Sequence, residues 1–245
     1  MTPFESVTTS GNPTVFGLAH ILYLVITTAM MVASLILIKK YCKTKRSQNI
    51  AVIIAASLLL VSIIMNRITV SLYSGNWISL VPTSFCGMTS LLFSVAALIF
   101  FRRWNHSIFH FFIYLAFLGG VIANFYPDYI GQASTIWHGR TITGLLHHTF
   151  ATYLAVLLVV LGLFKPELRR WYCLPLGFTV YMTLGLFMVS VLPISDAMHI
   201  NNPIVPVLEW YIIGPLFVAL QVTSLAIYER IKQVRNKKKE TSQPI

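Results

Sequence analysis

The stretch TITGLLHHTFATYLAVLLVVLGLF, residues Thr141–Phe164, decides the fold. It is long enough to cross a bilayer, because about 20 apolar residues span the hydrocarbon core. Its second half is plain apolar helix, whereas its first half carries the adjacent histidines His147 and His148. Ionisable side chains at membrane depth are costly and usually face a bundle interior or a water-filled cavity. The stretch therefore predicts a membrane helix with a polar, functional first half.

The composition of the whole chain agrees with a membrane protein. Of 245 residues, 56% are hydrophobic and 10% are charged, whereas a soluble domain has about 25% charged residues. The net charge of +11 lies mainly at Lys39–Arg46 and Arg230–Lys239, each directly after a hydrophobic stretch. This placement is typical of the positive-inside rule, with a secondary role on anionic lipid headgroups. It argues against nucleic acid as a partner.

Seven hydrophobic stretches indicate an all-α, polytopic membrane protein, a bundle of seven transmembrane helices. Residues 1–14 are expected to form an exposed N-terminal tail, residues 15–230 a single seven-helix membrane domain, and residues 231–245 a basic cytoplasmic tail. The first ten residues contain no Lys or Arg, so a cleavable signal peptide is not expected. The predicted spans are Val15–Ile38, Ile50–Tyr73, Leu80–Phe101, Ile108–Phe125, Thr141–Phe164, Tyr172–Leu192 and Val207–Tyr228.

The distribution of Lys and Arg between the loops predicts the orientation. With the N-terminus outside, all of these residues except Arg67 and Arg140 fall in the inner loops and the C-terminal tail. Cytoplasmic loops carry such an excess. We therefore expect the N-terminus outside and the C-terminus inside.

On this topology the polar residues of the spans gather near the outer face. Because the inner halves of the spans hold almost none, a shared cavity open to the outside is expected. Simpler roles stay open for several of them: headgroup contact for Arg67, helix-dipole compensation for Glu209, and interhelical hydrogen bonds for the two asparagines. The outer residues are Asn66, Arg67, Cys86, Asn124, His147, His148 and Glu209.

Cys86 is the cysteine of the outer half. Cys42 and Cys173 are expected at the inner face, about 30 Å away, whereas a disulfide needs Cα atoms about 4.4–6.8 Å apart. A thiol and a histidine at one depth form the minimal arrangement of nucleophile and base. Neighbouring helix residues lie about 100° apart, so His147 and His148 can hardly address the same point. Which of them would serve Cys86 stays open.

Four segments carry a resemblance to a known family. Residues 80–100 (LVPTSFCGMTSLLFSVAALIF), 119–128 (GGVIANFYPD), 144–150 (GLLHHTF) and 207–217 (VLEWYIIGPLF) together resemble the YwaF / transmembrane protein 164 family of integral membrane proteins. The resemblance covers roughly residues 50–228. The family pattern places a Cys on the third helix, Pro-Asp after the fourth, one His on the fifth and Trp-Tyr on the seventh. These positions are Cys86, Pro127 with Asp128, His148 or His147, and Trp210 with Tyr211.

The resemblance implies a phospholipid acyltransferase with a thioester mechanism. We therefore expect a lipid acyltransferase, or an acyl hydrolase, that uses a Cys–His pair in an outer-leaflet cavity. Cys86 would take an acyl chain from one membrane phospholipid and pass it to an acceptor lipid, with His148 (or His147) as base. Arg67 would bind the headgroup phosphate, and Asn66 or Asn124 would stabilise the oxyanion. Glu209, Trp210 and Tyr211 complete the predicted substrate-binding residues. The bacterial members of the family place the protein in the plasma membrane; no cofactor is expected, and the oligomeric state is open.

Two rival functions remain. A zinc-dependent lipid hydrolase needs three protein ligands and a water molecule, but no metal-ligand spacing stands out, so no metal site is predicted. A receptor or transporter-like protein would use the same cavity to bind a small ligand. The residues that a zinc site would draw on are Asp128, His138, His147 or His148, Asp196, His199 and Glu209.

Overall fold

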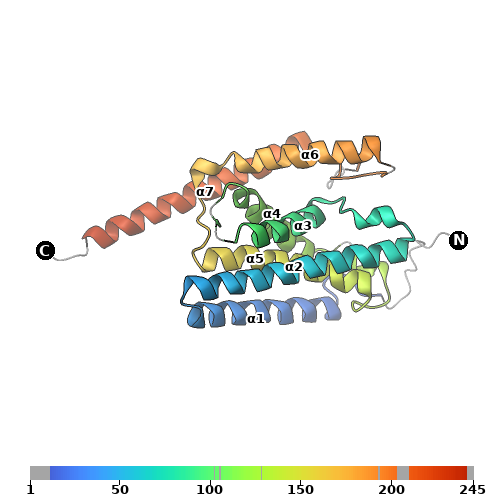
Figure 1. Cartoon of the computed structure of the whole chain (residues 1–245), viewed down its shortest axis with the longest axis horizontal. Helices are drawn as coiled ribbons and strands as arrows, with labels where there is room; N and C mark the ends of the chain where they lie inside the picture. Colours follow the sequence, from blue (N-terminus) through green and yellow to red (C-terminus); the bar gives the residue numbers. More distant parts are fainter. Residues whose placement is uncertain are drawn as a thin grey trace. The chain divides into compact units, whose positions relative to one another are not determined.

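The part of the chain that the structure describes contains seven α-helices, the number predicted (Figure 1). The computed structural model describes residues 12–101, 103–104, 106–127, 129–192, 194–202 and 210–241, without the side chains of residues 210–211 and 235–241. These described residues contain no β-strand. The helices are α1 (Leu18–Tyr41), α2 (Lys45–Ser74), α3 (Phe85–Ile99), α4 (Phe109–Phe125), α5 (Gly139–Val160), α6 (Cys173–Val191) and α7 (Trp210–Thr241), with short 3-10 turns η1 (Trp77–Leu80), η2 (Ile130–Gln132) and η3 (Leu168–Arg170).

Five of the helical segments are long and apolar enough to cross a membrane. Helices α3 and α4 have 15 and 17 residues. At a rise of about 1.5 Å per residue, they reach only about 22–26 Å, less than the hydrocarbon thickness of about 30 Å. Seven helices are thus confirmed, whereas seven full membrane crossings and their orientation stay predictions. The five long segments are Leu18–Tyr41, Lys45–Ser74, Gly139–Val160, Leu168–Val191 and Ile212–Val234.

Helix α3 begins five residues later than the predicted span because of the local sequence. Pro82 lacks a backbone N–H and disfavours helical geometry in the residue before it. The chain therefore runs extended after η1, until Ser84 caps α3 by accepting a hydrogen bond from the Gly87 N–H (3.1 Å). This late start puts Cys86 in the first turn of the helix.

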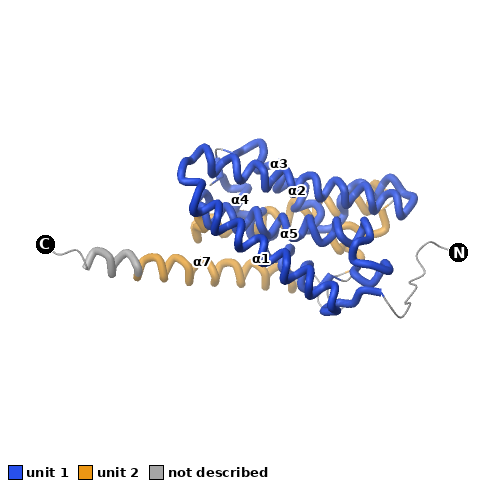
Figure 2. Tube along the Cα trace, turned by 90° about the horizontal axis from the view of Figure 1, so that it is seen from below, with its two compact units in different colours: residues 1–164 blue, residues 165–245 orange. Residues whose placement is uncertain are grey.

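The chain divides into two compact units, residues 1–164 and residues 165–245 (Figure 2). In the first unit, α5 packs mainly against α2 and α4, while α3 packs against both α2 and α4. In the most apolar 18-residue segment of α5, 67% of the residues are buried, whereas in that of α1 only 6% are buried. Helix α5, predicted above as the deciding stretch, is therefore the centre of this unit.

The second unit contains η3, α6 and α7. The Leu168 N–H donates a hydrogen bond to Glu229 Oε1 of α7 (2.8 Å), and the Arg170 guanidinium pairs with Glu167 (3.0 Å). Helix α7 continues to Thr241, past the predicted end of the last span at Tyr228. The prediction of one seven-helix domain covers both units and stays a prediction.

Candidate functional site

The thiol of Cys86 lies directly over α4. A Cβ atom added to Gly119 would be 3.0 Å from the Cys86 sulfur, so the missing side chain of this glycine makes room for the thiol. Cys86 is half-buried and takes part in no disulfide. Its position in the first turn of α3 also places it where the helix dipole favours negative charge. A thiolate at Cys86 is thus supported by its own helix.

The two histidines of α5 are both buried, with 4% of His147 and 7% of His148 exposed. Their ring centroids are 4.0 Å apart. A hydrogen bond of 3.1 Å joins His147 Nδ1 to the Ser90 hydroxyl of α3. Ser90 follows Cys86 by four residues, so both lie on one face of α3. His147 therefore contacts the α3 face that carries the thiol.

His148 faces a different neighbour. Its ring stacks near that of Tyr129, with centroids 6.4 Å apart and planes at 22°. A Cβ atom on Gly120 would lie 2.7 Å from the His148 carbonyl oxygen and would collide with the Thr152 hydroxyl. The pair Gly119–Gly120 thus lets α4 approach α3 with one residue and α5 with the next. Cys86 and His148 contact adjacent positions of α4.

Asn66 and Arg67 of α2 lie at the start of α5. The Arg67 guanidinium donates to Asn66 Oδ1 through Nε (3.2 Å) and through Nη2. Asn66 Nδ2 donates to the Thr143 hydroxyl (3.2 Å) and to the Arg140 carbonyl oxygen (3.4 Å). Thr143 precedes His147 by one helical turn, so these hydrogen bonds hold Asn66 and Arg67 beside the turn of α5 that leads to the histidines. The structure thus brings Asn66 and Arg67 together with the histidine pair.

Asn124 takes part in a network that joins α1, α4 and α5. Its Nδ2 donates to the Gly120 carbonyl oxygen (2.8 Å), and its Oδ1 accepts from the Thr149 hydroxyl (3.1 Å). Because Thr149 uses its proton there, the Tyr23 hydroxyl is the donor in the 2.7 Å bond to Thr149. The Nε2 of His20 donates to the Asn124 carbonyl oxygen (2.8 Å). These contacts fit the interhelical role left open for Asn124; a role in substrate binding stays a prediction.

Three other predicted site residues cannot be placed beside the thiol. Glu209 lies outside the described residues, as does Asp128 of the family pattern. Trp210 and Tyr211 begin α7 in the second unit, and their side chains are not described. Their predicted roles in substrate binding stay predictions.

The residues weighed for zinc are engaged elsewhere. The His138 ring stacks on Tyr73, with centroids 4.3 Å apart. In the second unit, Asp196 Oδ1 accepts the Asn201 N–H (3.0 Å) and His199 Nδ1 donates to the Asn202 carbonyl oxygen (3.2 Å). Within the described part of the chain, no group of three His, Cys, Asp or Glu residues is arranged to hold a metal ion.

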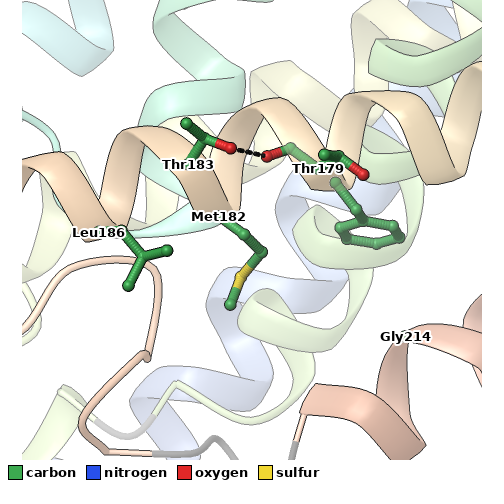
Figure 3. Close-up of a pocket in the computed structure, with 6 residues that line it drawn as sticks. Thr179, Met182, Thr183, Leu186 and Gly214 are labelled. Atoms are coloured by element: carbon green, nitrogen blue, oxygen red, sulfur yellow. Dashed lines mark hydrogen bonds between the residues drawn. The ribbon is translucent and has the colours of Figure 1, made fainter.

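A separate cavity of about 260 Å³ lies in the second unit, between α6 and α7 (Figure 3). One of its walls includes Thr183, whose hydroxyl donates to the Thr179 carbonyl oxygen (2.8 Å). None of the described residues that line it has an ionisable side chain. Its lining residues are Phe178, Thr179, Met182, Thr183, Leu186 and Gly214.

Sequence reasoning missed three residues that contact the predicted site: Ser90, Tyr129 and Thr143. The spacing of four residues between Cys86 and Ser90 was a signal that could have identified the serine, because such residues share a helix face. Thr143 lies one helical turn before His147 and carried the same signal. Nothing in the sequence places the loop residue Tyr129 beside Gly144 and His148, where its ring lies.

One of the comparisons with known proteins identifies a family for the chain. A model of the TMEM164 family matches residues 15–227, which is most of the chain. No curated protein matches the chain, and no solved structure matches it.

Proposed function

The chain belongs to the TMEM164 family, and on that premise we propose that it is a phospholipid acyltransferase or acyl hydrolase with a Cys–His pair. Its apolar helices and its family make it an integral membrane protein. The proposed nucleophile is Cys86, and the proposed base is an imidazole of α5, His148 or His147. The substrates are membrane phospholipids.

One observation carries the proposal. The Cys86 thiol of α3 lies against Gly119 of α4, and the backbone of His148 lies against the adjacent Gly120. The buried His147 imidazole is hydrogen-bonded to Ser90, one turn after Cys86 on α3, and its ring lies beside that of His148. Buried histidines and a thiol at a helix N-terminus are the groups that a thioester mechanism needs. The half-buried thiol is the member of this group that a lipid ester can approach.

The proposed chemistry has two halves. The imidazole takes the thiol proton, the sulfur attacks the ester carbonyl carbon, and a C–S bond forms while the ester C–O bond breaks. The lysolipid alkoxide leaves with the proton from the imidazolium. The hydroxyl of an acceptor lipid, or water in a hydrolase, then loses its proton to the imidazole and attacks the thioester. The thiolate is the leaving group and takes the proton back from the imidazolium, which restores the enzyme.

The side chains of α2 supply the proposed contact with the headgroup. Arg67 is half-buried and hydrogen-bonded to Asn66, so its guanidinium is held in place close to the histidine pair. Arginine binds phosphate through charge-assisted, often paired hydrogen bonds. A phosphate at Arg67 would put the ester of the same lipid near Cys86. The proposal includes an outer-leaflet site, with the N-terminus outside and the C-terminus inside.

The late start of α3 supports access from one side. The extended residues between η1 and α3 leave backbone groups that need hydrogen-bond partners. Non-helical backbone at membrane depth is tolerated where it is buried in protein or lines a water-filled space. A water-lined approach at this end of α3 would let a headgroup and the acceptor hydroxyl reach the thiol.

The test is acyl transfer by purified protein in lipid nanodiscs. A phospholipid with a labelled acyl chain is the donor, and a lysophospholipid is the acceptor. Cys86→Ser is expected to abolish transfer. His148→Ala is expected to abolish it if His148 is the base, and His147→Ala is expected to abolish it if His147 is the base. Cys42→Ala is the matched control, because Cys42 is also a half-buried reduced thiol. Wild-type transfer by Cys86→Ala protein would exclude the thioester mechanism.

A further inference from the structure

Ser90 and His147 form a buried pair that the proposed mechanism has not yet used. The hydroxyl of Ser90 and Nδ1 of His147 are 3.1 Å apart. Only 1% of Ser90 and 4% of His147 are exposed, so water does not compete for this hydrogen bond. A serine on a helix often bonds to its own backbone. Here its hydroxyl reaches across to a neighbouring helix and fixes the position of one imidazole.

The geometry favours His147 as the imidazole that faces the thiol. Side chains on a helix lean towards its N-terminus. Helices α3 and α5 of the first unit run in the same direction (Figure 1), and the bond between Ser90 and His147 joins them in their N-terminal halves. The His147 side chain therefore leans towards the end of α3 where Cys86 lies. Cys86 and Ser90 are one turn apart, with Cβ atoms about 5–6 Å from each other.

His148 has different surroundings. Its ring stacks near Tyr129. Its carbonyl oxygen lies close to Gly120 and accepts a hydrogen bond from the Thr152 hydroxyl (3.0 Å). These contacts lead from His148 to Tyr129, to α4 and along α5, whereas the hydrogen bond of His147 leads to α3. Of the two imidazoles, His147 is the one that a hydrogen bond holds against the Cys86 face.

We propose that Ser90 is a positioning residue that holds His147, not His148, as the base for Cys86. This inference rests on the proposed function and assigns the base within it. The nitrogen that bears the proton in an imidazole is set by the hydrogen bond of the other nitrogen. When Nδ1 donates its proton to the Ser90 oxygen, the lone pair of Nε2 is available to take the thiol proton. In the described part of the chain, two charged or titratable groups of α2 and α5 face His147. They are the Arg67 guanidinium of α2 and the His148 ring of α5.

The pair can be tested without any acyl transfer. In a Cys42→Ser, Cys173→Ser background, Cys86 is the single thiol, and its alkylation by a small neutral maleimide is followed in nanodiscs between pH 5 and pH 10. Removal of the base in His147→Gln is expected to lower the alkylation rate at pH 7 about tenfold and to move the rise in rate to higher pH. Ser90→Ala is expected to shift the profile in the same direction, and Ser90→Thr, which keeps the hydroxyl, to restore it.

His106→Gln, which changes an exposed histidine outside the candidate site, is the matched control, and its alkylation profile is expected to follow that of the parent protein. His148→Gln tests the rival assignment of the base. Thermal unfolding and size-exclusion profiles of each variant separate loss of the base from loss of the fold. The proposal is overturned if His148→Gln, and not His147→Gln, slows alkylation, or if folded Ser90→Ala protein has the parent profile. If alkylation depends on Ser90 and His147 but no acyl transfer occurs, the proposed function fails and the pair stands. If transfer occurs and only His148→Gln abolishes it, the pair fails and the function stands.

Discussion

The sulfur of Cys86 on α3 lies so close to Gly119 on α4 that a Cβ atom there would be 3.0 Å away. This contact fixes the space available to the thiol, because no side chain of α4 fills it. The neighbouring Gly120 is still closer to the backbone of α5, where a Cβ atom would be 2.7 Å from the His148 carbonyl oxygen. Two consecutive glycines thus bring the three helices of the candidate site into direct contact.

Gly119→Ala is expected to displace the thiol without unfolding the protein. The added methyl group would meet the end of a small side chain, which can rotate away, and not backbone. Acyl transfer and Cys86 alkylation are both expected to fall about tenfold or more, because a misplaced nucleophile loses its alignment. Gly214→Ala is the matched control, since nothing lies within 4 Å of a Cβ atom at that helical glycine. Unchanged alkylation in Gly119→Ala would show that the contact does not limit the thiol.

Arg67→Gln is expected to weaken the binding of phospholipids and not that of lipids without phosphate. A hydrogen bond to a charged group contributes about 1.5–3 kcal/mol, which corresponds to about 10- to 100-fold in KM. Transfer from a phosphate-free diacylglycerol should change little. Arg170→Gln, which removes an arginine paired with Glu167 far along the chain, serves as the control. Equal loss on both donors would mean that Arg67 supports the fold and not the headgroup.

Tyr23→Phe is expected to destabilise the first unit while the chemistry at Cys86 is retained. The change removes the donor of a buried 2.7 Å hydrogen bond to Thr149, which costs about 1 kcal/mol. Thr149 keeps its bond to Asn124. Thermal unfolding in detergent measures the loss, and Tyr153→Phe, which breaks the half-buried bond to Ser34, provides the comparison. A large loss of alkylation at Cys86 would instead connect this network to the candidate site.

The orientation can be read from cysteine labelling in intact cells. With Cys86 and Cys173 replaced by serine, Cys42 at the end of α1 is expected to react with a membrane-impermeant maleimide only after permeabilisation. Ser134→Cys, an exposed position before α5, is expected to react in intact cells. The opposite pattern would place the N-terminus inside and the candidate site at the inner leaflet.

The sequence allowed the seven helices to be predicted because each apolar stretch is bounded by charged, glycine or proline residues. The start of α3 was placed too early, at Leu80, since hydrophobicity continues through Pro82 while helical hydrogen bonding does not. The grouping of Asn66, Arg67 and the histidines followed from counting depth along each helix. That count gives no rotation about the helix axis, so it could not tell which histidine faces α3.

The partners of Asn124 show another limit. His20 and Tyr23 lie in an apolar first span and gave no signal that they would meet α4 and α5. Their contacts depend on how α1 packs, which periodicity along one helix does not report. The role of Gly119 and Gly120 is of the same kind, because a close approach between helices involves residues distant in sequence.

The most direct test of the central claim is mass spectrometry of the purified protein after incubation with a phospholipid that carries an isotope-labelled acyl chain. The account predicts a labelled acyl group on the peptide that contains Cys86, released by neutral hydroxylamine as a thioester is, and absent from Cys86→Ser protein. Full acyl transfer by Cys86→Ala protein, or turnover with the label found on no cysteine, would contradict it.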